Sequence, residues 1–184
     1  FLSATGVQGP EELDGHSFLP LLKGESQAGR DRVFTQIDMK AGGDAVPMRC
    51  VQNAKYGYIY NPFSDGRHVY RHNAEGVGMK AMNAAARQDA DIAARIQLFR
   101  YRVPEEFYDL EKDPDCLHNL IDSPEHADKV AAMRGELQAW MSATHDPMLT
   151  ALQNRTQRAT VDKVMQDTYG KSPTRSKPKK RARK

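Results

Sequence analysis

Short runs of apolar and β-branched residues predict strands in the first third of the chain. The runs 32–37, 46–52 and 55–60 have the length and composition of strands, and a further run begins at Phe107. Only two residues separate the second run from the third, so we expect a short turn there. Pro47 has no N–H to donate to a sheet, which places it at a strand start or on an edge.

The stretch 124–142 has the strongest helical pattern in the sequence. Ser123, Pro124 and Glu125 are typical of an N-cap, a first helical position and a first turn. Apolar residues then recur at the three- and four-residue spacing of one helix face, and one face of the predicted sheet is their natural partner. The residues of this helix face are Ala127, Val130, Ala131, Leu137, Trp140 and Met141.

Aromatic residues indicate which face of the sheet this helix covers. Successive side chains of a strand point to opposite faces, so Tyr56, Tyr58 and Tyr60 lie on the same face. We expect Tyr56, Phe107 and Trp140 to share one interior.

Three further stretches carry helical patterns. In 79–99, methionines, alanines and Ile96 recur at helical intervals with no Gly or Pro between them, so we expect one helix. The stretch 148–169 predicts another. Near the N-terminus, a short apolar helix is expected between an N-cap at Ser17 and a closing Gly24.

The segment 107–120 links the fourth predicted strand to the amphipathic helix. It reads Phe-Tyr-Asp-Leu-Glu-Lys-Asp-Pro-Asp-Cys-Leu-His-Asn-Leu, and Asp113 and Pro114 predict a tight turn after the strand. This order resembles a signature near the C-terminus of sulfatases: Leu-Tyr-Asp-Leu, two variable residues, Asp-Pro, one variable residue, Glu, two variable residues, Asn-Leu. Phe107 and Cys116 stand where the signature has Leu and Glu.

Two other parts of the chain resemble the same family, in the same order along the sequence. Residues 6–7 and 10–24 resemble a sulfatase pattern of Gly-Val, a Pro-containing loop and Asp-Gly-variable-Ser-Leu/Phe-Leu-Pro-Leu-Leu-variable-Gly. Pro-Met-Arg at 47–49, together with Thr-His-Asp-Pro at 144–147 after the helix that bears Trp140, resembles the heparan N-sulfatase (N-sulfoglucosamine sulfohydrolase) branch. The resemblance extends over about 1–148.

The resemblance implies an α+β fold, in which a small antiparallel sheet of about four strands is packed by a C-terminal amphipathic helix. This is the C-terminal subdomain of sulfatases, within the alkaline-phosphatase-like superfamily. We accordingly divide the chain into the end of a catalytic domain with a connector (1–29), the subdomain (30–147), a helical extension (148–170) and a basic tail (171–184). Because the sequence begins with Phe1 and shows no targeting segment, we expect a C-terminal piece of a longer polypeptide.

Charge is distributed unevenly along the chain. The formal net charge is +3, but 171–184 holds eight Lys and Arg and no acid, so the remainder carries −5. A solvated basic tail can bind polyanions, including nucleic acid and sulfated glycan, through counterion release. No aromatic residues are interleaved to stack on bases, so we expect no specific nucleic-acid partner. No apolar run approaches the roughly 20 residues of a membrane helix.

Two sequence features leave alternatives open. Cys50 and Cys116 could form one disulfide bridge or remain two half-buried thiols, and so small a cysteine count favours the thiols. Asn154-Arg155-Thr156 is formally a glycosylation acceptor, and chance occurrence on a helix is the alternative that we favour.

Sulfatase chemistry, as the resemblance implies it, needs groups that this chain lacks. The family's nucleophile is a formylglycine made from Cys or Ser in a Cys/Ser-variable-Pro-variable-Arg motif, and no Cys or Ser here has that context. The family's cation is usually calcium, held by hard oxygen ligands, but no Asp-Asp pair follows an early strand. We therefore expect no catalytic residue and no metal ligand in this chain, and calcium in the full-length enzyme.

Two loops are candidates to face the substrate pocket of such an enzyme. They are 38–44 and 65–72, in which Lys40, Arg67 and His68 could meet an anionic sugar. The alternative is that these three side chains are simply solvated.

The same loops carry two further observations. In the heparan N-sulfatase branch, the loop before Pro-Met-Arg carries a His-His-Glu group near the pocket, where Met39, Lys40 and Ala41 stand here. His68 and His72 are four residues apart, but the surrounding glycines argue against a metal site.

Two functional hypotheses follow. In the first, the chain is part of a sulfatase that hydrolyses sulfate esters or sulfamates, with a sulfated glycan or small sulfated substrate and its own N-terminal catalytic domain as partners. The resemblance then implies a secreted or periplasmic protein. In the second, the chain is a non-catalytic module that holds polyanions through its basic tail.

Overall fold

The computed structural model describes residues 1–13, 15–39, 45–70 and 76–170. The chain divides into two compact units, Phe1–Val33 and Phe34–Lys184. In the first unit, a 3-10 turn at Leu2–Thr5 precedes the short helix α1 (Leu19–Leu22). Ser17 Oγ accepts a hydrogen bond from Leu19 N (3.3 Å) ahead of α1.

Gly24 follows the end of α1 in the left-handed region, at φ 79°. Its position there lets Glu25 N donate back to Pro20 O (3.0 Å), which closes the helix. The short helix expected between Ser17 and Gly24 is therefore present.

The second unit is built on a four-stranded sheet in the order β1-β2-β3-β4. The strands are β1 (Val33–Met39), β2 (Ala45–Gln52), β3 (Tyr56–Tyr60) and β4 (Glu105–Asp109). β3 pairs antiparallel with both β2 and β4. The expected α+β fold with a small antiparallel sheet is confirmed.

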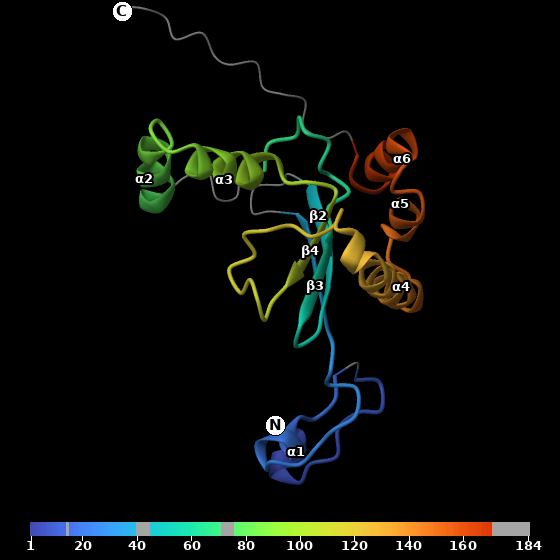
Figure 1. The fold of residues 1–184 in the computed structure, drawn as a ribbon. Coiled ribbons are helices and arrows are strands. Elements are labelled where there is room, and N and C mark those ends of the chain that lie inside the picture. The colour runs from blue at the N-terminus through green and yellow to red at the C-terminus, as the bar shows by residue number, and fades with distance from the viewer. Residues whose placement is uncertain (14, 40–44, 71–75, 171–184) are drawn as a thin grey trace, which may run out of the picture. The chain divides into compact units, whose positions relative to one another are not determined.

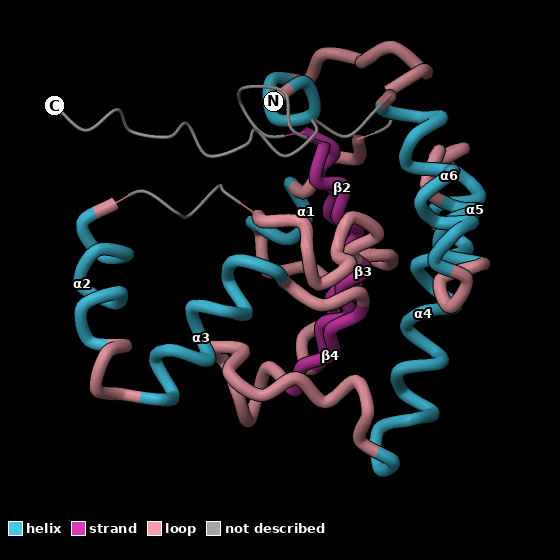
Figure 2. Tube along the Cα trace, turned by 90° about the horizontal axis from the view of Figure 1, so that it is seen from above, coloured by secondary structure: helices cyan, strands magenta, loops and turns pink. Residues whose placement is uncertain are grey.

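Helices lie on both sides of this sheet (Figures 1 and 2). On one side are α4 (Ala127–Ala143), α5 (Leu149–Gln153) and α6 (Arg158–Tyr169). On the other side are α2 (Val77–Ala85) and α3 (Ala90–Tyr101). None of the helices in the described part of the chain is long and apolar enough to cross a membrane.

The hydrophobic core lies between the sheet and the layer of α4, α5 and α6. Tyr58 is the centre of a cross-strand row, paired with Val51 of β2 and Phe107 of β4. Tyr56 stacks on Phe107 with ring centroids 5.3 Å apart, and both Tyr56 and Trp140 pack against this core. The expectation that Tyr56, Phe107 and Trp140 share an interior is confirmed. The residues of α4, α5, α6 and the turn before α5 that are buried in the same core are Val130, Met133, Leu137, Met141, Met148, Ala151, Leu152 and Val161.

The amphipathic helix differs in detail from the predicted one. Ala127 and Ala131 are exposed, whereas Met133, which the pattern did not include, is buried. A 3-10 turn, Pro124–His126, precedes α4. The Ser123 hydroxyl lies 3.0 Å from Nδ1 of the His126 ring and does not cap a backbone N–H.

The single helix predicted at 79–99 is wrong, because the chain forms two helices there. Asp89 has an extended backbone, and its carboxylate accepts hydrogen bonds from the N–H groups of Asp91 and Ile92 (both 3.0 Å). This is an N-cap, which begins α3 anew without any Gly or Pro.

The stretch 148–169 likewise contains two helices, with a break between Gln153 and Arg158. Two arginines at the break bond to other parts of the fold: Arg155 pairs with Glu105 of β4, and Arg158 with the loop after β3. These contacts outweigh the local helical pattern.

Candidate functional site

The loop after β3 is tied to the segment that leads into β4. Asn61 N donates to Pro104 O (2.8 Å), and its side-chain amide donates to Glu106 Oε1 (2.7 Å). Ser64 Oγ donates to Tyr101 O (2.9 Å). The first residues of this loop are therefore buried and fixed, although they lie outside any regular element.

Glu106 of β4 anchors this loop. Its carboxylate is 1% exposed and accepts hydrogen bonds from Asn61, from Arg102 Nη2 (2.9 Å) and from the Tyr108 hydroxyl (2.8 Å). Burial and the neighbouring carboxylate raise the pKa of Tyr108, so its hydroxyl remains a donor. A paired and hydrogen-bonded charge of this kind is tolerated in the interior.

A turn built on Asp65 positions His68. Asp65 Oδ1 accepts hydrogen bonds from the N–H groups of Arg67 (2.8 Å) and His68 (2.6 Å). Burial would raise the pKa of Asp65, but these two bonds outweigh it and hold the pKa below its ordinary value of 3.8. The His68 ring packs edge-on against Phe63, with centroids 5.6 Å apart.

A cavity of about 390 Å³ lies between this loop and α6. Its size is within the range of small-molecule sites. The lining combines aromatic, apolar and polar side chains, among them Phe63, His68, Asp162, Met165, Gln166 and Tyr169.

Arg158 fastens the start of α6 to the same loop. Its Nη1 donates to Pro62 O (2.9 Å) and Ser64 O (3.0 Å), and its Nε donates to Asp162 Oδ1 (2.7 Å). The two walls of the cavity are thus held together by direct bonds.

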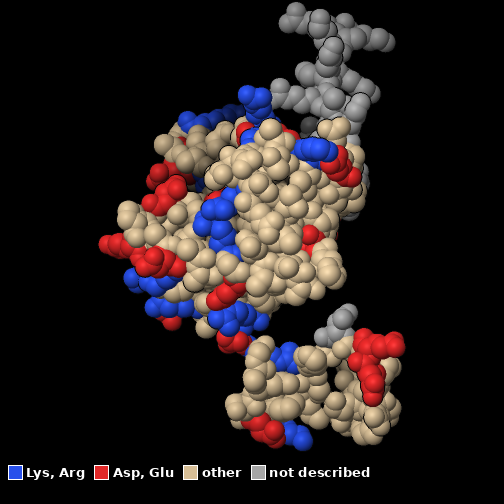
Figure 3. All heavy atoms as spheres, turned by 90° about the vertical axis from the view of Figure 1, so that its right-hand side faces the viewer, with Lys and Arg blue, Asp and Glu red and all other residues tan. Residues whose placement is uncertain are grey.

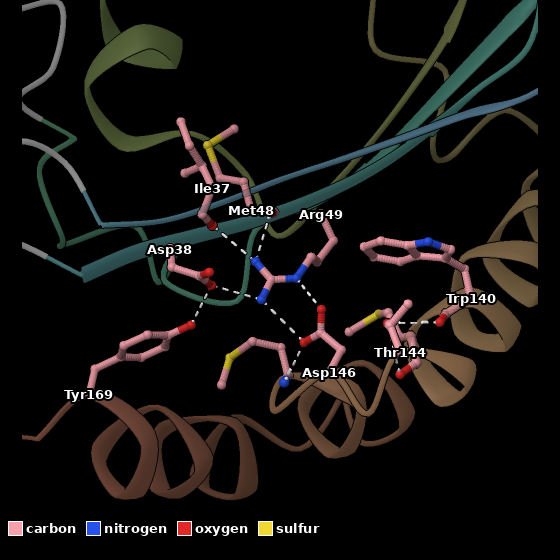
Figure 4. Close-up of polar contacts among 10 residues, drawn as sticks. Ile37, Asp38, Met48, Arg49, Trp140, Thr144, Asp146 and Tyr169 are labelled. Carbon is pink, nitrogen blue, oxygen red and sulfur yellow. Dashed lines mark hydrogen bonds and ion pairs between the residues drawn. The ribbon is translucent and has the colours of Figure 1, made fainter. Parts of the chain in front are cut away.

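A buried charge cluster lies between the sheet and the layer of α4, α5 and α6 (Figure 4). Arg49 is 1% exposed, and its Nε donates to Asp146 Oδ2 (2.5 Å) while its Nη2 donates to Asp38 Oδ1 (2.7 Å). Tyr169 donates its hydroxyl to the same Asp38 oxygen (2.6 Å). The cluster joins β1, β2, the turn after α4 and the end of α6.

The carboxyl group of Asp38 should make stability depend on pH. Burial raises its pKa, but hydrogen bonds from Tyr169 and Arg49 outweigh burial, so the pKa lies below its ordinary value of 3.8. Its contribution is therefore fully present above the unfolded pKa, and is lost as pH falls through the lower folded pKa. We expect the stability advantage of the wild type over Asp38→Asn to shrink below about pH 4. Urea unfolding of both proteins between pH 2.5 and 7 measures it, and a constant difference would contradict this role.

Comparison with known proteins identifies the relatives of this fold. No family model matches the chain. An ulvan-active sulfatase from Formosa agariphila is 26% identical over 150 residues, which are 79% of this chain and 28% of that protein. The N-sulphoglucosamine sulphohydrolase of Homo sapiens is 28% identical over 145 residues, 76% of this chain and 28% of that protein. The chain is similar in sequence to sulfatases.

A solved structure supports the same likeness of fold. A 2-O GAG sulfatase superposes with a TM-score of 0.51 at 20% identity, over 79% of this chain and 23% of its own. The chain thus spans about a quarter of the length of the sulfatases that it matches.

The sulfatase signature forms a closed loop in the structure. Asn119 Oδ1 accepts a hydrogen bond from Phe107 N (2.9 Å), and Leu120 N donates to Phe107 O (2.8 Å). Within the loop, Asp113 accepts from the N–H groups of Leu117 (2.9 Å) and His118 (2.8 Å). The Asn-Leu end of the signature therefore returns to its first residue.

The three residues predicted to bind substrate are placed differently. His68 lines the cavity, whereas Arg67 is exposed and does not line it. Lys40 and Ala41, with His72, lie outside the described residues. A role in substrate binding stays a prediction for all three.

Sequence reasoning missed the pairing of Arg49 with Asp146. The two residues are 97 positions apart and belong to the two stretches that resemble the heparan N-sulfatase branch, 47–49 and 144–147. A signal was available, because Arg49 lies two residues before Val51, on the same inward-facing side of the strand, and a buried Arg needs a carboxylate partner.

The structure bears on the cysteine pairing and on metal ligands. Cys50 and Cys116 are free, half-buried thiols, and burial raises the pKa of both. Within the described ranges, no group of three or more His, Cys, Asp or Glu side chains is placed to hold a metal ion.

Proposed function

We propose that this chain is the C-terminal subdomain of a sulfatase that hydrolyses sulfate esters or sulfamates on a sulfated glycan. The observation that carries the proposal is the Arg49–Asp146 ion pair. It joins two distant sequence stretches that resemble one sulfatase branch, in a fold like that of a solved sulfatase. The names of the relatives support the substrate class, since one acts on ulvan and another on N-sulphoglucosamine.

In this proposal the reacting groups belong to polypeptide outside this sequence. The formylglycine nucleophile and the calcium ion that sulfatase resemblance implies would be held there, because the described residues offer no cluster of metal ligands. This chain would supply part of the pocket wall, from the loop that bears His68. The same resemblance supports a secreted or periplasmic location.

The decisive experiment starts with the gene. We expect the coding sequence ahead of Phe1 to contain a Cys/Ser-variable-Pro-variable-Arg motif, and the full-length protein to release sulfate from sulfamated or O-sulfated sugars. The 184-residue chain alone should not hydrolyse an aryl sulfate. A start codon directly ahead of the codon for Phe1, or turnover by the chain alone, would contradict the proposal.

One observation favours a second candidate, a polyanion-binding module. The stretch 171–184 holds eight Lys and Arg and no acid, whereas Figure 3 shows basic and acidic side chains mixed over the face that it displays. Polyanion binding would then depend on the tail. Deleting 171–184 should abolish salt-dependent retention on heparin in this case, and unchanged retention would exclude it.

A further inference from the structure

The cavity beside His68 is completed by a helix that the sulfatase resemblance does not include. The resemblance extends over about 1–148, whereas α6 begins at Arg158. Asp162, Met165 and Gln166 of α6 nevertheless form one wall of the cavity. The extension therefore gives this chain a concave site that the recognised motifs do not predict.

The walls of this cavity are fixed in place by hydrogen bonds from two of its lining residues, Arg158 and Tyr169. Arg158 bonds α6 to the carbonyl groups of Pro62 and Ser64 at one end. At the other end of α6, Tyr169 donates to Asp38 of β1. A site held in this way loses little conformational entropy when a ligand enters it.

The lining is amphipathic, as a sugar ring is. Met165, which is half-buried, supplies an apolar surface, whereas Phe63 is only 2% exposed and is stacked on Tyr70 at a centroid distance of 5.7 Å. The His68 ring and the Gln166 amide make no hydrogen bond to any described residue. Both groups can donate and accept, so they suit hydroxyl groups.

The charges around the cavity are already balanced. Asp162 is paired with Arg158, and the Asp65 carboxylate accepts two backbone N–H bonds. Among the residues that the structure describes, the lining has no second Arg or Lys to neutralise a sulfate group. An uncharged ligand is therefore favoured over an anionic one.

We propose that this cavity binds an unsulfated, hydroxyl-bearing sugar unit of the glycan. The inference rests on the proposed function, and it assigns α6 to recognition of a unit other than the one that carries the reacting sulfate. Gln166 and His68 bind hydroxyl groups of this unit, and Met165 lies against its apolar face.

The test is an NMR titration of the 184-residue chain. The probes are the methyl glycosides of N-acetylglucosamine, which is neutral, and of N-sulfated glucosamine, which is anionic. We expect the neutral probe to bind more tightly and to shift the side-chain signals of His68 and Gln166. Gln166→Leu should weaken binding at least about fivefold, because one hydrogen bond is worth roughly 1 kcal/mol.

Gln153→Leu is the matched control, because Gln153 is an exposed glutamine at the end of α5 that does not line the cavity. It should bind the neutral probe as the wild type does. Tighter binding of the N-sulfated probe, or equal binding by Gln166→Leu and wild type, would overturn the inference. Because the titration measures binding and not sulfate release, its failure is distinguishable from failure of the proposed function.

Discussion

Asp146→Ala is expected to lower the free energy of unfolding by about 3–5 kcal/mol. The substitution leaves the Arg49 guanidinium buried without its closest carboxylate, at a site where the arginine is 1% exposed. It also removes the acceptor for Met148 N, which donates to Asp146 Oδ1 at 2.7 Å. Urea unfolding monitored by circular dichroism measures the loss.

Two variants separate the buried charge from other effects. Asp167→Asn breaks an exposed pair with Lys163 and should cost no more than about 0.5 kcal/mol. Arg49→Met combined with Asp146→Leu removes both buried charges, and should be more stable than Asp146→Ala because the carboxylate that loses its cation, Asp38, is 40% exposed. A loss below about 1 kcal/mol for Asp146→Ala would show that Arg49 does not depend on this partner.

Phe107→Ala should destabilise the protein by about 3–5 kcal/mol, because it opens a cavity in the core between the sheet and α4. Phe107 is fully buried, pairs with Tyr58 across the strands and stacks on Tyr56. Chemical denaturation of the purified wild type and variant measures this loss in the free energy of unfolding.

Leu117→Ala provides the comparison within the same signature segment. Leu117 is 53% exposed, so its truncation should change stability by less than about 0.5 kcal/mol. Similar losses for the two variants would mean that the segment does not pack as described.

The sequence allowed the sheet and α4 to be predicted because their patterns are local and strongly periodic. Tyr56 and Tyr58 alternate along a strand, and Leu137 and Met141 recur at helical spacing. The division of 79–99 could not be read in the same way, because Asp89 resembles any exposed helical acid until its carboxylate is seen to cap α3.

The candidate site was predicted only in part, for a related reason. His68 could be singled out by residue type and by its loop, and it does line the cavity. Gln166 and Asp162 could not be singled out from the sequence, because they become part of a site only when α6 packs beside the loop after β3. Hydrogen bonds of Arg158 and Tyr169 hold α6 in that position, and no local sequence pattern predicts the partner of either residue.

The hydroxyl of Tyr169 reaches a carboxylate 131 positions earlier in the chain. During synthesis, β1 and β2 therefore leave the ribosome well before Tyr169, which completes their charge cluster, is made. Contacts between such distant segments form slowly, because the intervening chain must close a long loop first. Until then, Arg49 is paired with Asp38 alone and lacks Asp146, which lies 97 positions later in the chain, and Asp38 lacks the hydroxyl of Tyr169.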